Sequence, residues 1–178
     1  MPRPFSRRRA LEAEAGRLYA AIVARARQPG LYREFGVADT LDGRFEMLVL
    51  HVVVLLRRLR ELGEAELAQA VVDNMFADLD QALREIGVGD ISVARKIRPM
   101  AEAFQGRAAA YGAALSMGDD GDALARALAR NVFAGEVAPP RAGALALYVR
   151  RLEVRLGALT PGEIGADPAG WPEPSAAP

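Results

Sequence analysis

The most apolar segment of the chain is residues 42–62, D-G-R-F-E-M-L-V-L-H-V-V-V-L-L-R-R-L-R-E-L. Within it, residues 47–56 are apolar except at His51, a pattern typical of a helix that is buried on every side. The β-branched residues 52–54 would also suit a buried strand. However, the three- and four-residue spacing of apolar positions continues through Leu59 into a charged, helix-favouring stretch. We therefore predict a buried central helix.

Apolar stripes on both sides of this segment predict further helices, because their positions also recur every three and four residues. Together with the central one, the predicted helices span residues 7–28, 42–62, 64–86, 90–116, 122–133 and 140–159. The predicted fold class is all-α, a single compact helical domain of about six helices around the buried central helix. Asp42 is expected to cap the central helix. Pro99 is expected to kink or split the helix over residues 90–116.

The two ends of the chain differ in composition from its middle. Residues 1–30 are expected to form an N-terminal helix and a basic arm, and residues 31–159 the main helical domain. Residues 160–178 are rich in Pro, Gly and Ala, so we expect them to be a disordered tail. Trp171 in that tail is expected to be idle, or else a weak docking anchor.

The composition excludes several classes of protein. The 23 basic side chains balance 23 acidic ones, whereas general nucleic-acid-binding proteins usually have a marked basic excess, so we expect no specific nucleic-acid partner. The absence of cysteine excludes disulfides, thiolate metal sites and a cysteine nucleophile. The apolar run over residues 47–56 is half of the roughly 20 residues that span a bilayer. Glu12 and Glu14 follow the N-terminal arginines and argue against a targeting peptide, so we expect a cytoplasmic location.

Residues that could carry chemistry are few. His51 is the only histidine; it is chemically able to be an axial haem ligand, but we favour a buried imidazole bonded to a carboxylate or a backbone carbonyl. The paired Glu-x-x-His motifs of di-iron bundles are absent, as are a phosphate-binding loop and a nucleophile elbow. Helix caps and surface ion pairs account for the carboxylates. We therefore predict a protein that is not an enzyme, with no cofactor and no metal site.

Five segments in this order resemble a known family. They are D-T-L-D-G-R-F-E-M-L-V-L-H-V (residues 39–52), L-A-Q-A (67–70), L-D-Q-A-L-R-E-I-G-V-G-D (79–90), M-A-E-A-F-Q-G-R (100–107) and Y-G-A-A-L (111–115). Their order and spacing are similar to those of the ubiquinol–cytochrome c chaperone family, the assembly factors of the cytochrome bc1 complex. The block over residues 79–90 is the most specific. Pro99 and Gln105 depart from the pattern, where we expect a good helix former and an aromatic residue.

This resemblance implies a function and partners. The protein would be a bacterial, non-enzymatic assembly chaperone, with residues 31–159 as its chaperone domain. It would bind newly synthesised cytochrome b and promote assembly of the ubiquinol–cytochrome c reductase (bc1) complex. The ribosome or the membrane surface would be further contacts, with the protein peripheral on the inner face of the cytoplasmic membrane.

A chaperone of this kind needs an apolar groove ringed by polar groups, since its client exposes apolar helices before insertion. We predict that the connection over residues 35–41 and the helices over residues 64–86 and 90–116 line the groove. The predicted client-binding residues are Phe35, Leu41, Met75, Phe76, Phe104 and Tyr111, with Asp80, Arg84 and Glu85 as the charged rim. Methionine and aromatic side chains adapt to varied partners, although the same residue types also fill cores.

Three alternative functions stay open. One is a helical protein–protein interaction adaptor with a different partner. A second is a small enzyme that uses buried carboxylates, which would show a closed polar pocket. The third is a regulator that binds nucleic acid through its arginines, which would show a basic stripe on one face.

Overall fold

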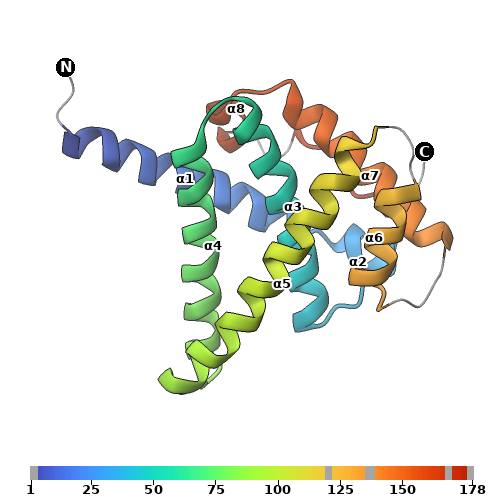
Figure 1. The fold of residues 1–178 in the computed structure, drawn as a ribbon, viewed down its shortest axis with the longest axis horizontal. Coiled ribbons are helices and arrows are strands. Elements are labelled where there is room, and N and C mark those ends of the chain that lie inside the picture. The colour runs from blue at the N-terminus through green and yellow to red at the C-terminus, as the bar shows by residue number, and fades with distance from the viewer. Residues whose placement is uncertain (1–3, 119–121, 135–138, 167–169, 176–178) are drawn as a thin grey trace.

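The computed structural model describes residues 4–118, 122–134, 139–166 and 170–175, and these residues form eight helices without any strand (Figure 1). The helices are α1 (Pro4–Ala26), α2 (Pro29–Arg33), α3 (Leu41–Glu61), α4 (Ala65–Glu85), α5 (Asp90–Ser116), α6 (Asp122–Val132), α7 (Pro139–Gly157) and α8 (Pro161–Ala166). The all-α prediction is confirmed. The six long helices lie close to their predicted ranges, and the short α2 and α8 were not predicted.

Helix α3 is the centre of the core, as predicted from its apolar sequence. Every residue from position 46 to position 56 is buried, and α3 packs against α1, α4, α5, α6 and α7. The helix begins one residue earlier than predicted. The side chain of Thr40, and not that of Asp42, caps it by accepting a 3.2 Å hydrogen bond from the Gly43 amide. Asp42 instead lies in the first turn, where a carboxylate is favoured by the helix dipole.

Helices α4 and α5 form an antiparallel hairpin whose end projects away from the rest of the molecule (Figure 1). The turn between them contains Gly87 in the left-handed region, with φ +85°, a conformation that a residue with a Cβ rarely adopts. Two isoleucines at this end are exposed, Ile86 by 68% and Ile91 by 89%. Helix α5 continues through Pro99 without a break, so the expected split does not occur.

The expected disorder from residue 160 onward does not hold for α8 or for the segment over residues 170–175. Ile164 of α8 is fully buried, and Trp171 is only 2% exposed. Helix α8 packs against α1. The proline- and glycine-rich composition suggested disorder, but the buried side chain of Ile164 anchors α8 to the body, and that of Trp171 anchors residues 170–175.

Candidate functional site

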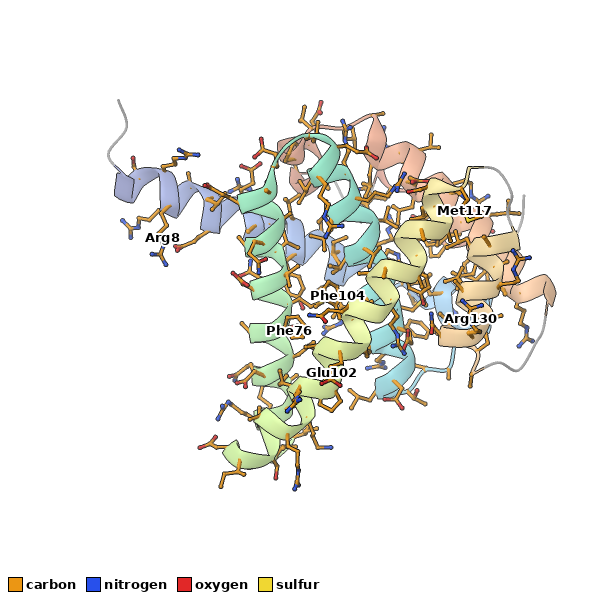
Figure 2. All side chains as sticks on the ribbon, in the orientation of Figure 1. Arg8, Phe76, Glu102, Phe104, Met117 and Arg130 are labelled. Atoms are coloured by element: carbon orange, nitrogen blue, oxygen red, sulfur yellow. The ribbon has the colours of Figure 1, made fainter. Side chains whose placement is uncertain are left out.

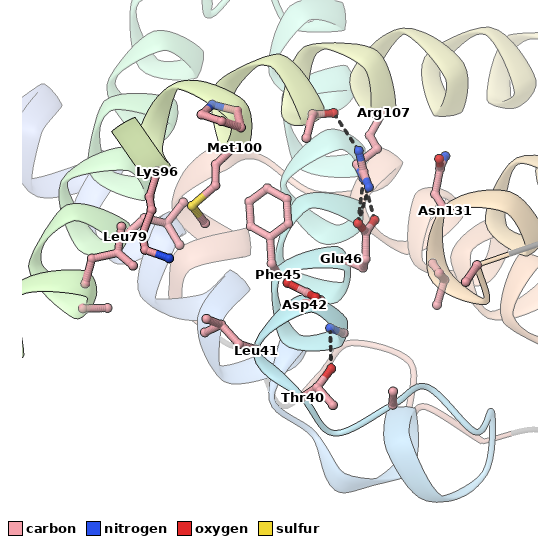
Figure 3. Close-up of a pocket in the computed structure, with 18 of the residues that line it drawn as sticks. Thr40, Leu41, Asp42, Phe45, Glu46, Leu79, Lys96, Met100, Arg107 and Asn131 are labelled. Carbon is pink, nitrogen blue, oxygen red and sulfur yellow. Dashed lines mark hydrogen bonds and ion pairs between the residues drawn. The ribbon is translucent and has the colours of Figure 1, made fainter. Parts of the chain in front are cut away.

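A groove of about 770 Å³ lies between the start of α3, the end of α4, the first half of α5 and the end of α6 (Figure 3). Its apolar lining includes Leu41, Phe45, Leu79, Leu83, Ile86 and Met100. These elements meet here because the α4–α5 hairpin extends past the first turn of α3. The stripe of α4 that packs in the core at Val71 continues into the groove at Leu79 and Leu83.

The floor and edges of this groove are apolar and partly open. Figure 3 shows the side chain of Met100 beside the ring of Phe45, in the middle of the groove. At the edges, Leu41 is 66% exposed and Ile86 is 68% exposed. Large apolar side chains left open around a hollow are typical of a surface that binds another molecule. Methionine, with three rotatable bonds, can adjust to differently shaped partners.

A partly buried ion pair bounds the groove toward α6. The Arg107 Nε donates to both carboxylate oxygens of Glu46 at 2.8 and 2.7 Å, and Nη2 donates to Oε1 at 2.5 Å. These hydrogen bonds raise the pKa of Arg107, while Glu46 is only 6% exposed. The Arg107 Nη1 also donates to the Ala103 carbonyl at 3.3 Å, and Asn131 of α6 lies opposite the pair (Figure 3). This boundary is polar and fixed, in contrast to the adaptable floor.

Sequence reasoning did not identify the pair of Glu46 and Arg107 as part of the site. One signal was available, because Glu46 is an acidic residue at the beginning of an otherwise apolar run. Its partner comes from a helix 61 positions later in the chain, and no local pattern specifies that pairing. On the hairpin side of the groove, the lining also includes Arg95 and Lys96, both exposed cations.

The predicted client-binding residues lie in different surroundings. Of the apolar set, only Leu41 lines the groove. Phe35, Met75 and Tyr111 have no exposed surface and belong to the core, where the rings of Phe35 and Tyr148 lie 5.7 Å apart. They are core residues because they lie on the sides of their segments that face the centre of the molecule.

Phe76 and Phe104 join the two helices of the hairpin and do not line the groove. Figure 2 shows them between α4 and α5. Their ring centroids are 5.8 Å apart in an edge-on arrangement, a favourable geometry for aromatic pairs. Phe104 is 8% exposed and Phe76 is half-buried. The pair stabilises the hairpin that forms one wall of the groove.

The three predicted rim residues lie on α4 but are not part of the groove lining. Arg84 pairs with Asp80 at 2.6 Å and also with Asp90 at the beginning of α5. Both hydrogen bonds raise the pKa of Arg84. Glu85 accepts a 2.9 Å hydrogen bond from the Gln81 side chain. Of these exposed interactions, the pair of Arg84 and Asp90 connects the two ends of the hairpin turn, and the other two lie within α4.

His51 is a structural residue of the core, in agreement with the favoured interpretation of the sequence. Its Nδ1 donates to the Met47 carbonyl at 2.7 Å, and its Nε2 accepts from the Tyr148 hydroxyl at 2.8 Å. Burial lowers the pKa of His51 to about 4, so the neutral imidazole is held at neutral pH. Both ring nitrogens are engaged, which leaves neither free to ligate haem iron.

The part of the chain that the structure describes contains neither a metal-binding cluster of side chains nor a membrane-spanning helix. Among those residues, no group of three or more histidine, cysteine, aspartate or glutamate side chains could hold a metal ion. None of the helices within the described ranges is both long enough and apolar enough to cross a bilayer.

The chain is similar in sequence to one known family and to two known proteins, one of which has a solved structure. The model of the family described as ubiquinol-cytochrome C chaperone matches residues 33–169, a range that contains the whole groove lining. Ubiquinol-cytochrome-c reductase complex assembly factor 1 of Xenopus laevis is 29% identical over 138 residues, which cover 76% of this chain and 68% of that protein. The crystal structure of the Cbp3 homolog from Brucella abortus matches with a TM-score of 0.78 and 39% identity, covering 92% of each chain.

Proposed function

The chain belongs to the ubiquinol-cytochrome C chaperone family, and we propose that it assists assembly of ubiquinol–cytochrome c reductase (the bc1 complex) by binding newly synthesised cytochrome b in the groove. The assembly role rests on the family and on the relative named as an assembly factor of this complex. The identity of the client and the place where it binds are our proposal. It acts by binding alone, without catalysis and without a cofactor.

The observation that carries the proposal is the open apolar groove within the part of the chain that matches the family. A membrane protein that has not yet met its partner subunits exposes apolar helix faces, and these bind well in a groove of complementary character. Leu41 and Ile86 are two-thirds exposed, so a client that covered them would remove apolar surface from water on both sides. In the free chain, that surface is left open.

The groove supports temporary holding better than permanent binding. Met100 and Phe45 form a floor that can adapt to different side chains. The pair of Glu46 and Arg107 is already satisfied internally, so a client gains little from displacing it. Binding therefore depends on a few apolar contacts, which a partner subunit can replace when the client is passed on.

The proposed place of action is the inner face of the cytoplasmic membrane, where a newly made membrane protein first requires protection. Contact with the ribosome or with the bilayer surface stays a prediction. A helical adaptor with a different partner is the alternative function, and it predicts normal levels of the bc1 complex when the gene is deleted.

Deletion of the gene, followed by complementation, tests the proposal. Cytochrome b is measured by reduced-minus-oxidised absorption spectra, and the assembled complex by native electrophoresis. We expect both to fall on deletion and to be restored by the wild-type gene but not by a Leu41→Ser/Ile86→Ser variant.

The matched control is Leu147→Ser/Val154→Ser. It changes two apolar residues of α7 that are 64% and 75% exposed and lie outside the groove lining. This control should restore both signals. Normal cytochrome b and normal complex in the deletion strain would contradict the assembly role, whereas full restoration by the groove variant would contradict the groove as the client site.

A further inference from the structure

Residues 170–175, G-W-P-E-P-S, pass across the body of the protein after α8, and we call them the strap. Trp171 is 2% exposed and Pro174 is buried. The strap residues contact side chains from α1 and α7 and the backbone of α2. Residues 171–175 are not helical, so side chains of the body have to satisfy their backbone groups.

Three arginines hold the strap by its main-chain carbonyls. Arg25 of α1 donates to the Trp171 carbonyl at 3.3 Å and to the Pro172 carbonyl at 3.1 Å. From α7, Arg155 donates to the Gly170 carbonyl and Arg151 to the Ser175 carbonyl, both at 2.9 Å. Four of the six strap carbonyls are thus bound by guanidinium groups. Such contacts recognise an extended backbone independently of most of its side chains.

The body is also shaped to receive the proline end of the strap. Gly30, at the beginning of α2, faces Pro174, and a Cβ at position 30 would lie 2.3 Å from the Pro174 carbonyl oxygen. Only glycine leaves room for so close an approach. The buried charge of Arg25, which is 3% exposed, also lies 3.6 Å from the carboxylate of Glu173.

Together, these features form a slot in the body that we define by Arg25, Gly30, Arg151 and Arg155. It recognises an extended segment by its carbonyls, by a buried aromatic ring and by a closely packed proline. Proline-containing segments are already extended and therefore lose little entropy on binding. One group in the strap is unsatisfied: within the described residues, the buried Trp171 Nε1 has no hydrogen-bond partner. That unpaired donor weakens docking of the strap.

We propose that the slot is a peptide-binding site for an extended Trp-Pro-Xaa-Pro segment, and that residues 170–175 of the chain are its resident, exchangeable occupant. The same segment supplied by another molecule would compete with the strap for the slot. This proposal does not depend on the identity of the client in the groove, because none of the residues that define the slot lines the groove.

The test uses the full-length chain and its single tryptophan. Incorporation of 5-fluorotryptophan gives one ¹⁹F resonance, whose position distinguishes a docked strap from a free one. An unlabelled peptide of residues 170–175 is then added. The short tether keeps the strap near the slot at an effective concentration on the order of millimolar. We therefore expect the ¹⁹F signals of the free and the docked strap to be equal when the competing peptide reaches about that concentration. The same peptide with Trp171→Ala should leave the docked signal unchanged.

Two chain variants make the test specific. Pro174→Gly weakens the strap but leaves the slot intact, so the native peptide should displace it at a lower concentration than in the wild-type chain. Gly30→Ala fills the slot, so its strap should give the free signal before any peptide is added. The proposal is overturned if the docked signal resists a large excess of peptide in both the wild-type and the Pro174→Gly chains. It is also overturned if the wild-type strap gives only the free signal, or if the alanine peptide displaces it equally well.

Discussion

Replacing the two most open apolar side chains of the groove, in the variant Leu41→Ser/Ile86→Ser, should weaken client binding without unfolding the chaperone. The two residues are 66% and 68% exposed in the free chain. Full burial of a leucine or isoleucine side chain contributes about 1.5–3 kcal/mol, so covering the remaining two-thirds contributes roughly 1–2 kcal/mol for each. The double change should therefore cost about 2–4 kcal/mol of binding free energy, which raises the apparent Kd roughly 30- to 700-fold.

The free energy of unfolding should change little in this variant, because substitutions at exposed positions usually shift it by less than about 0.5 kcal/mol each. The assay is capture of cytochrome b made by cell-free translation with nanodiscs, with tagged chaperone titrated across several orders of magnitude. The concentration for half-capture gives the apparent Kd. Urea unfolding of the same preparations confirms that the variants are folded.

The control variant Leu147→Ser/Val154→Ser removes the same kind of exposed surface from α7, where the two residues are 64% and 75% exposed. Its apparent Kd should equal that of the wild-type chain. If both double variants weaken capture equally, binding is a general effect of exposed apolar surface and the groove has no special role. If neither does, the groove residues do not contact the client, and the reasoning from their exposure is refuted.

Three further predictions concern the fold that supports the groove. Tyr148→Phe removes the hydroxyl that donates to the His51 Nε2. The buried acceptor that is left unsatisfied should lower the free energy of unfolding by about 1–3 kcal/mol in urea titrations. An unchanged urea midpoint would contradict the hydrogen bond between Tyr148 and His51. The pKa of His51 falls from 6.5 to about 4 on folding, so between these pH values only the unfolded chain takes up the proton. The contribution of the neutral imidazole to the free energy of unfolding is therefore complete above pH 6.5, and about 3 kcal/mol of it is lost as the pH falls to 4. This loss should be missing in a folded His51→Gln variant. Gly43→Ala places a Cβ 1.9 Å from the Ala38 carbonyl oxygen, so we expect a clearly lower melting temperature by circular dichroism. An unchanged melting temperature would show that the start of α3 can shift freely.

Much of the fold followed from local patterns in the sequence. The apolar run that contains His51 is long enough and regular enough to specify a buried helix, and α3 is that helix. Gly87 and Gly89 lie in the sequence between the apolar stripes of α4 and α5, where the hairpin turns. These features depend on residues close together in the chain, where periodicity and turn chemistry are informative.

The strap could not be predicted because its contacts are distant in sequence. Arg25 and the Pro172 carbonyl are 147 positions apart, and nothing near either residue indicates the other. Composition alone suggested a disordered tail, since glycine, proline and alanine bury little surface. The single buried ring of Trp171, together with hydrogen bonds from three arginines, was enough to hold the segment in place.

The groove shares α4, α5 and the end of the 35–41 connection with the predicted one, but it is also lined by α3 and α6, and Leu41 is the one predicted residue in its lining. Met75 and Leu79 belong to one apolar stripe of α4, yet Met75 is fully buried while Leu79 lines the groove. Helical periodicity identifies a stripe but does not show at which residue of α4 the packing against the neighbouring helix α3 ends. The position of that boundary decides which residues of the stripe are core and which are open, and it is a property of the packed structure.

Site-specific photo-crosslinking tests the central claim, that the groove holds cytochrome b, most directly. A benzophenone amino acid is placed at Leu41, or at Leu147 as the equally exposed control, in cells that are making the bc1 complex. We expect light to join cytochrome b to the chain carrying the probe at position 41 and not to the chain carrying it at position 147. Crosslinking of cytochrome b from position 147 alone, or capture of only unrelated proteins at position 41, would contradict the claim.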